Sequence, residues 1–439
     1  MAKKVTKTQA KKAANAAKKH PKIVIAIVVI VLLIVIAAVV LYFVKPDLYH
    51  KYLGIGGHDF DNNGVCTVCG YEKSETGQGN LEDIQDADLS IHFMELGNKN
   101  AGDSILIKCG NTEVLIDAGS QQSSAATIKN YVDRYCTDGV LDYVISTHAD
   151  SDHISAFVGT SSAKGIIYQY EIGTFIKFDR SDKSPTTSSG NKSLYGQYLD
   201  AVKYLEEETD THVFTASQCY EESGGAQRQY YLDDAHTVSI NVLYNYYYYN
   251  SSSDENNYSV VTLLTQELQN GKKHYLFTGD LEKDGESKMV DYYASASNSK
   301  SAYDVLPEVE LYKAGHHGSK TSSTMKLLNV IKPKYVAVCC CCGAPEYTKN
   351  NDNTFPTQEM INNVGKFTDK IYVTTLGTGL PDKDADGNYI SQSYGGYESM
   401  NGDIVFYYKD GKLNLYCSNN DTILKNTEWF KENRTWTGV

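Results

Sequence analysis

The residues best suited to chemistry lie in one short stretch, Ser146–His153, which reads STHADSDH. It places two imidazoles, His148 and His153, beside two carboxylates, Asp150 and Asp152. Imidazole nitrogen and carboxylate oxygen together bind zinc, manganese or iron. The alternative is a polar turn with two incidental histidines. Further motifs downstream favour a site for two divalent metal ions.

The elements around this stretch are arranged to hold it in place. The apolar run Val140–Ile145 directly before it is typical of a buried strand, and the small polar residues after it are typical of a tight loop. A strand end is rigid, so a loop there can direct several side chains at one point. The sequence therefore predicts a metal-binding loop at the end of a strand.

The chain before this loop alternates apolar runs with turn residues. We expect a strand at 90–96, a hairpin of strands 103–108 and 112–119 around Gly110-Asn111, and a helix at 121–135. With the strand that follows, this order predicts an α/β layered domain that begins at Leu89.

The chain after the loop continues the same pattern. Helices are expected near 194–208 and 284–294. Strands are expected at 258–265, 274–280, 309–313 and 335–342, with a late hairpin around Asp410-Gly411. The strand at 335–342 ends in four cysteines, Cys339–Cys342. Because side chains alternate faces along a strand, these four read as small core residues.

Six further cysteines lie elsewhere. Cys66 and Cys69 form a C-x-x-C-G knuckle with His58 eight residues upstream, which is zinc-ligand spacing, and His50 could supply a fourth ligand. We expect residues 45–73 to be a zinc-ribbon-like module folded by a structural zinc; the alternative is a flexible stalk with reactive thiols. The sequence leaves open whether the four scattered cysteines pair: Cys109, Cys136, Cys219 and Cys417.

The N-terminal part predicts a membrane anchor. Residues 1–22 contain eight lysines and no acid, and 23–44 are an uninterrupted apolar run long enough to cross a bilayer. The flanking lysines predict a cytoplasmic N-terminus, one transmembrane helix and an extracellular remainder at the cell membrane. A cleaved signal peptide is the alternative. Residues 74–88 are polar and acidic, which is typical of a linker.

The charge balance bears on the substrate. The chain has 41 basic and 54 acidic side chains. Without the eight N-terminal lysines, 33 basic side chains face 54 acidic ones, a net charge of −21. Such a surface does not attract polyanions in general, so a nucleic-acid substrate would need a local basic groove or bound metal.

Four motifs in order now resemble a known family: LIDAGS, THADSDH, TGDLE and HHGSKTSS. They are similar to the metallo-β-lactamase superfamily, and more closely to the extracellular hydrolase domain of the ComEC/Rec2 DNA-uptake proteins. The resemblance covers about residues 89–415 and implies a four-layer αββα sandwich over 89–439. Those proteins also have a membrane channel of many spanning helices, which has no counterpart in this sequence. One spanning helix cannot thread DNA, so we do not infer a DNA-uptake pore.

The resemblance implies a set of ligands for two metal ions. His148 and Asp150 would bind the first ion, Asp280 would bridge both ions, and the remaining residues would bind the second ion. The residues implied for the second ion are Asp152, His153 and His316.

The resemblance also implies supporting roles. Asp152 would take the proton of the attacking water, and Asp117 would orient a ligand histidine. His317 could hold or protonate the leaving group.

Two positions depart from the family pattern. A third histidine for the first ion is not evident, and His212 and His236 are the candidates in that interval. A histidine that often precedes a late proline in ComEC-type domains is Phe355 here, before Pro356. An oxygen-rich first site would shift the metal preference from zinc toward manganese.

The function implied is that of a metal-dependent hydrolase, a phosphodiesterase or nuclease with two divalent ions, zinc or manganese. Its substrate would be extracellular DNA or a phosphodiester of the cell envelope, and a separate membrane channel is a possible partner. The alternative is a non-catalytic surface binding module that retains the metal fold. The variant Asp152→Ala separates the two, because an enzyme would lose activity and keep its fold.

Overall fold

The computed structural model describes residues 81–295 and 305–439. The expected membrane helix at 23–44 and zinc module at 45–73, with His58, Cys66 and Cys69, lie outside the described residues. Within the described ranges, no helix is both long enough and apolar enough to span a bilayer.

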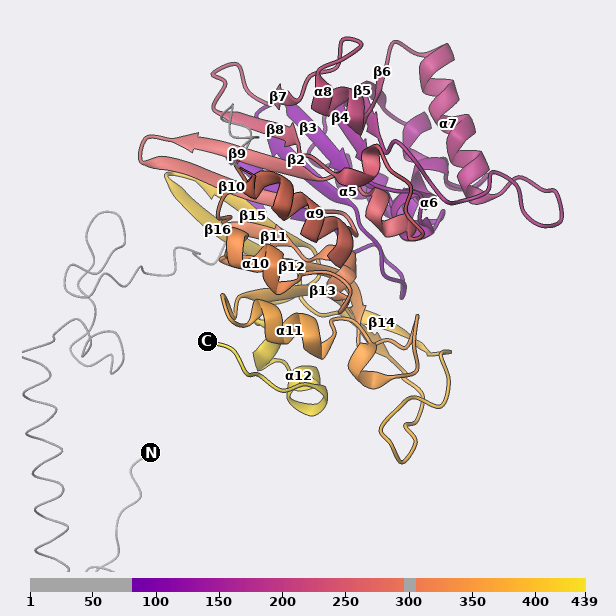
Figure 1. The fold of residues 1–439 in the computed structure, drawn as a ribbon, viewed down its shortest axis with the longest axis vertical. Helices are drawn as coiled ribbons and strands as arrows, with labels where there is room; N and C mark the ends of the chain where they lie inside the picture. The colour runs from indigo at the N-terminus through magenta and orange to yellow at the C-terminus, as the bar shows by residue number, and fades with distance from the viewer. Residues whose placement is uncertain (1–80, 296–304) are drawn as a thin grey trace, which may run out of the picture. The chain divides into compact units, whose positions relative to one another are not determined.

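Two eight-stranded sheets form the frame of this part of the chain (Figure 1). The first sheet has the order β16 (Lys412–Cys417), β15 (Ile404–Lys409), β1 (Leu89–Phe93), β2 (Ile105–Cys109), β3 (Thr112–Ile116), β4 (Val140–Ser146), β5 (Glu171–Lys177), β6 (His212–Thr215). The second has the order β14 (Gly396–Ser399), β13 (Ile371–Thr378), β12 (Tyr335–Cys342), β11 (Leu311–Lys313), β10 (Gly271–Phe277), β9 (Thr262–Leu268), β8 (Val238–Val242), β7 (Gln229–Tyr231).

The sheets pack face to face through large apolar side chains. The Phe93 ring of β1 lies 6.3 Å from the Phe277 ring of β10. The Phe406 ring of β15 lies 5.3 Å from the Tyr335 ring of β12. These contacts join the inner faces of both sheets into one apolar core, whose burial is the main force that holds the layers together.

Helices cover the outer faces of the sheets (Figure 1). The described helices are α4 (Leu81–Gln85), α5 (Ser124–Val132), α6 (Ser151–Val158), α7 (Leu194–Glu208), α8 (Ala216–Glu221), α9 (Lys283–Ala294), α10 (Met325–Ile331), α11 (Gln358–Val364) and α12 (Glu428–Asn433). Met289 of α9 and Leu328 of α10 pack with Leu276 and Val336 of the second sheet. The arrangement is therefore helix, sheet, sheet, helix.

Several expected elements are present in the structure. The hairpins around Gly110-Asn111 and Asp410-Gly411 form, and the helix expected at 194–208 is α7. The cysteine strand is β12, buried along its whole length, and the eight described cysteines are free thiols. The linker prediction is wrong for 81–85, which form α4, because Ile84 is only 1% exposed and packs into the core.

The topology gathers the polar motifs at one edge. β3 and β4 are parallel neighbours, and so are β10 and β11. Parallel strands end on the same side of a sheet, so the segments after these four strands lie together. Those segments begin at Asp117, Thr147, Thr278 and Ala314.

His92 in the core predicts a pH-dependent stability. Its Nδ1 lies 2.9 Å from the Tyr131 hydroxyl and its Nε2 lies 2.8 Å from Ser90 Oγ. Burial, with a smaller contribution from Lys108, lowers the pKa of His92 from 6.5 to about 3. The unfolded chain binds a proton near pH 6.5 that the folded protein binds only near pH 3, so stability is lost as the pH falls through that window.

We expect the free energy of unfolding to fall by up to about 1.4 kcal/mol per pH unit below pH 6.5 because of this one group. Urea unfolding of the wild type and of His92→Gln at several pH values measures it. The difference between the two proteins should shrink as the pH falls; a constant difference would contradict the prediction.

Candidate metal centre

Backbone hydrogen bonds hold the STHADSDH loop against two other segments. The Asp103 amide donates to the Asp152 carbonyl over 3.0 Å, and the Ala118 amide donates to the His153 carbonyl over 2.8 Å. A Cβ at Gly119 would lie 1.5 Å from the Asp152 carbonyl oxygen. Only glycine permits this approach, which explains the glycine of LIDAGS.

Asp117 fixes the orientation of His153. Its Oδ2 lies 2.7 Å from His153 Nδ1, and its two oxygens also accept from the amide and hydroxyl of Thr147. The predicted contact between Asp117 and a histidine of the motif is therefore present. Because Nδ1 is committed to Asp117, Nε2 of His153 is the atom left to face a ligand.

His317 is oriented in the same way from the opposite sheet. Its Nδ1 donates to the Cys339 carbonyl of β12 over 2.9 Å. Its Nε2 lies 3.1 Å from Asp280 Oδ2 and 3.3 Å from Asp152 Oδ2. His153 Nε2 also lies 3.2 Å from the same Asp280 oxygen. Two imidazoles and two carboxylates thus converge on one point.

The converging nitrogens fit a metal ion. His153 and His317 are fully buried, and within the described residues their Nε2 atoms have no hydrogen-bond partner. A buried polar atom without a partner costs free energy. A divalent cation bound by both Nε2 atoms would satisfy them, and imidazole with carboxylate is a donor set for zinc or manganese.

Two aspartates compete for the fourth ligand position. Asp103, His153, Asp280 and His317 form one group of potential ligands. However, Asp103 lies closest to the Nδ1 atoms: its Oδ1 is 3.4 Å from His317 Nδ1 and its Oδ2 is 3.9 Å from His153 Nδ1. It is therefore on the side of the imidazole rings away from the Nε2 atoms. We therefore assign the fourth position to Asp152, which faces His317 Nε2.

A buried lysine, Lys313, neutralises part of this negative charge. Its Nζ lies 2.5 Å from Asp103 Oδ2, 3.0 Å from Asp280 Oδ1 and 2.9 Å from the Gly279 carbonyl. Burial alone would lower the pKa of Lys313, but the two carboxylates raise it above its usual value, so it stays charged. Oδ1 of Asp280 thus contacts Lys313 and its Oδ2 faces the two histidines, and its predicted bridging role stays a prediction.

His316, which was predicted as a metal ligand, lies outside the group of potential ligands around His153 and contacts other side chains. Its side chain is 23% exposed, and its Nδ1 lies 3.0 Å from Glu282 Oε1 and 2.9 Å from Thr321 Oγ1. Burial would raise the pKa of Glu282, but the hydrogen bond with His316 and other contacts lower it to about 2. His317 instead belongs to the group of potential ligands, and its predicted role at the leaving group stays a prediction.

The residues predicted for a first metal ion are only partly brought together. His148 Nε2 lies 3.5 Å from Asp150 Oδ2. No group of three or more potential ligands in the described chain includes His148. His212 lies on β6 beside Phe214, and His236 stacks on Tyr231, so neither supplies the missing histidine. His148 Nε2 is nevertheless buried without a hydrogen-bond partner in the described residues, so the first metal ion stays a prediction.

Phe355 confirms that the late Phe-Pro position belongs to the site. Its ring lies 5.7 Å from the ring of His316, 6.1 Å from that of His317 and 5.5 Å from that of Tyr347. At the position where the family resemblance implies a histidine, this protein therefore has an aromatic ring that packs against the histidines of the site.

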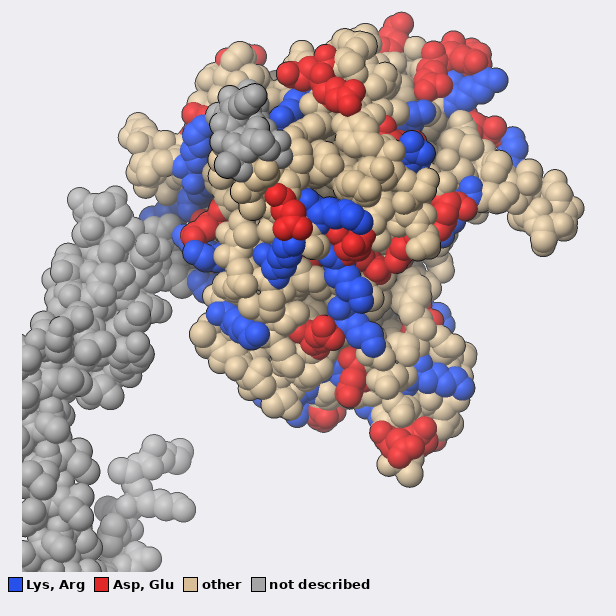
Figure 2. Space-filling model, viewed as in Figure 1, with Lys and Arg blue, Asp and Glu red and all other residues tan. Residues whose placement is uncertain are grey.

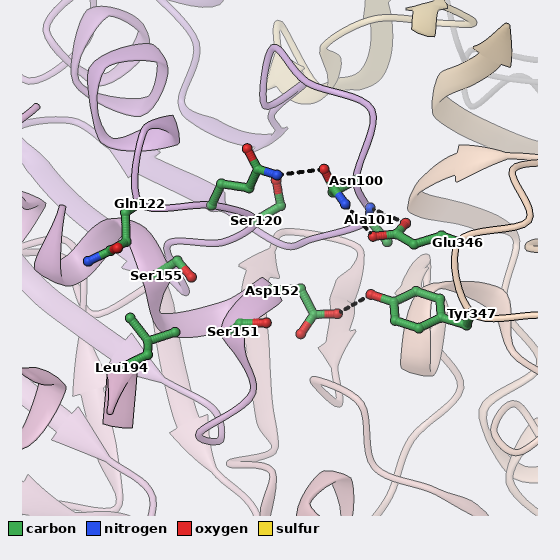
Figure 3. Close-up of a pocket in the computed structure, with 11 residues that line it drawn as sticks. Asn100, Ala101, Ser120, Gln122, Ser151, Asp152, Ser155, Leu194, Glu346 and Tyr347 are labelled. Atoms are coloured by element: carbon green, nitrogen blue, oxygen red, sulfur yellow. Dashed lines mark hydrogen bonds between the residues drawn. The ribbon is translucent and has the colours of Figure 1, made fainter. Parts of the chain in front are cut away.

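An open cavity of about 320 Å³ adjoins Asp152 (Figure 3). The Tyr347 hydroxyl donates to Asp152 Oδ2 over 2.9 Å at its edge, and Glu346 accepts from Asn100 and from the Ala101 amide. Most lining side chains are neutral hydrogen-bonding groups: Asn100, Ser120, Gln121, Gln122, Ser151 and Ser155. No lysine or arginine is among the described residues that line the cavity.

Sequence reasoning missed Asp103, Lys313 and Tyr347. Asp103 and Lys313 had a usable signal, since each is a charged residue at the end of an apolar run. Tyr347 had none, because it lies in a loop with no motif around it.

Comparison with known proteins finds a family for part of this chain. Residues 97–213 match the family model described as the metallo-beta-lactamase superfamily. The match includes the STHADSDH loop, Asp103 and Asp117. No curated protein matches the chain significantly.

Solved structures of the same description resemble the chain in part. The metallo-beta-lactamase fold protein YhfI from Bacillus subtilis is 12% identical, covers 57% of this chain and 86% of its own, and has a TM-score of 0.32. The metallo-beta-lactamase SMB-1 is 11% identical, covers 51% and 79%, and has a TM-score of 0.28. The metallo-beta-lactamase MIM-1 from Novosphingobium pentaromativorans is 12% identical, covers 44% and 62%, and has a TM-score of 0.25. Because these superpositions are so partial, the similarity to the metallo-beta-lactamase superfamily rests on the family model, which matches residues 97–213.

Proposed function

Because the chain contains a metallo-β-lactamase superfamily domain, we propose that it is a metal-dependent phosphodiesterase. The observation that carries the proposal is the convergence of two buried, unpartnered Nε2 atoms on the carboxylates of Asp152 and Asp280. Metals in this superfamily typically serve hydrolysis, and burying these donor groups costs free energy that a bound ion would offset.

Asp152, His153, Asp280 and His317 would hold the ion. A divalent cation bound there supplies a Lewis acid and lowers the pKa of water. The other residues keep the donors in place: Asp117 and the Cys339 carbonyl hold the two Nδ1 atoms, and Lys313 holds the outer oxygen of Asp280.

Proton transfer falls to Asp152 and His316. Asp152 remains partly accessible beside the cavity, and contacts with His317 and His153 outweigh its burial and lower its pKa. The lowered pKa keeps Asp152 ionised but makes it a weak base, so it could take a proton only from a water whose own pKa a bound cation would lower. The Tyr347 hydroxyl donates to Asp152 Oδ2. His316, held by Glu282 through Nδ1 and partly exposed, can donate a proton to the leaving oxygen.

The cavity favours a phosphodiester with an uncharged, hydroxyl-rich neighbouring group over a long polyanion. Amide and hydroxyl side chains bind such a group by hydrogen bonds, whereas Asp152 and Glu346 repel further phosphates. Figure 2 shows acidic and basic side chains interspersed on the visible face, without a broad basic surface. A phosphodiester of the cell envelope suits these features better than extracellular DNA, and would also suit the membrane anchor that the sequence predicts at 23–44.

The full chain should hydrolyse bis-p-nitrophenyl phosphate when zinc or manganese is added, and Asp152→Ala should reduce turnover at least about 100-fold while the protein stays folded. Single- and double-stranded DNA are assayed in parallel and are expected to be poorer substrates. Turnover that survives Asp152→Ala would contradict the proposed mechanism. Bound metal without turnover of any phosphodiester would favour the binding module instead.

A further inference from the structure

A lysine lies where the first metal ion of a dinuclear site would bind. Lys183 Nζ lies 2.7 Å from Asp150 Oδ1, while the other oxygen of Asp150 faces His148 Nε2 at 3.5 Å. Asp150, one of the two residues that the sequence assigns to the first ion, therefore already has a cationic partner. Lys183 comes from the loop between β5 and α7.

No other residue completes a metal site at this position. A zinc site normally needs at least three protein ligands, and His148 and Asp150 supply two. Asp280 is directed elsewhere, because its Oδ1 contacts Lys313 and its Oδ2 faces His153 and His317.

A buried carboxylate holds the Lys183 loop in place. Glu255 accepts from the Ala149 amide over 2.9 Å, from the Asp182 amide over 2.7 Å and from Ser181 Oγ over 2.8 Å. One side chain thus ties the residues before Lys183 to the residue between His148 and Asp150. The fold therefore fixes the backbone next to Lys183 close to the STHADSDH loop.

His148 offers one open nitrogen at this position. Its Nδ1 lies 3.1 Å from Thr147 Oγ1 and 3.4 Å from Ser259 Oγ. Because the Thr147 hydroxyl donates to Asp117, Thr147 Oγ1 can accept a hydrogen bond from Nδ1. Within the described residues Nε2 has no hydrogen-bond partner, and it lies 3.5 Å from Asp150 Oδ2. One imidazole nitrogen beside one carboxylate that already pairs with Lys183 is fewer than the three protein ligands that a zinc site normally has.

We propose that the Lys183 ammonium replaces the first metal ion, so that this domain binds one divalent ion and Lys183 binds an anionic oxygen of the substrate. The side chain of Lys183 is 38% exposed, which leaves its outer hydrogens accessible to a phosphate oxygen. The substrate role rests on the proposed phosphodiesterase function, whereas the number of metal ions does not.

The number of ions is measured first. The full chain is titrated with Mn²⁺, chosen because thiolates such as Cys66 and Cys69 prefer zinc. Free Mn²⁺ is followed by electron paramagnetic resonance. We expect one tightly bound ion per chain; two tightly bound ions would overturn the proposal.

The substrate role is tested with Lys183→Met, which keeps the length of the side chain and removes its charge. Turnover of bis-p-nitrophenyl phosphate should fall about 100- to 1000-fold, the usual effect of losing one charge-stabilising donor. Mn²⁺ affinity should stay within about threefold, because Lys183 is not a ligand. Lys183→Arg should recover part of the activity.

Lys192→Met is the matched control. Lys192 lies on the same loop and pairs with the exposed Asp200, away from Asp150. It should leave turnover unchanged. Equal activity of Lys183→Met and wild type would overturn the substrate role. If the wild type hydrolyses no phosphodiester, the proposed function fails, and the Mn²⁺ count still decides whether Lys183 replaces an ion.

Discussion

Replacing His317 by glutamine is expected to abolish tight metal binding, whereas the same change at His316 is expected to leave it intact. His317 Nε2 faces both Asp280 and Asp152, so its loss removes a direct ligand. Removal of a group that only orients a ligand costs 10- to 100-fold in affinity, so loss of the ligand itself should exceed about 100-fold. Mn²⁺ titration of the full-length variants measures the difference.

The pair of variants is closely matched, because the two histidines are neighbours and the substitution is the same. His316→Gln should lower turnover without changing metal affinity, since His316 contacts Glu282 and not the ligand carboxylates. If both variants lost the metal, or if His316→Gln alone lost it, the ligand assignment would be wrong.

Lys313→Met is expected to cause the largest loss of stability in the metal-free protein. The change leaves the carboxylates of Asp103 and Asp280 buried without their shared cation. Breaking a buried ion pair by removing one partner costs about 3–5 kcal/mol. Urea unfolding in the presence of a chelator measures the change.

Two further variants show whether the loss comes from the buried charges. Lys326→Met removes a lysine from an exposed pair with Asp291 and should cost less than about 1 kcal/mol. Adding Asp103→Asn to Lys313→Met should recover part of the stability, because one of the two unpaired charges is neutralised. A loss at Lys313 no larger than at Lys326 would show that the buried cluster does not need its cation.

Much of the frame could be predicted from sequence because its signals are local. An apolar run followed by STHADSDH gives β4 and its loop, and turn residues such as Gly110-Asn111 give the hairpins. The helix at 194–208 follows from its periodicity. α4 was missed because five residues with one buried side chain, Ile84, carry little periodicity.

The site was predicted less completely because part of its geometry is not local. His316 and His317 both have positive φ angles, 44° and 52°, in a turn that sends their rings in different directions. Spacing along the chain does not reveal which ring faces the metal ligands. Lys183, Glu255 and Tyr347 reach the site from separate loops, so only the folded chain brings them together.

The central claim is that Asp152, His153, Asp280 and His317 bind one divalent ion. A crystal structure of the full chain with Mn²⁺, with anomalous difference maps recorded around the manganese edge, tests it most directly. We expect one manganese peak bound by the Nε2 atoms of His153 and His317, about 2.0–2.2 Å from its ligands, and the Lys183 ammonium beside Asp150. A peak on the Asp103 side of the imidazoles, or no peak in this part of the chain, would contradict the account.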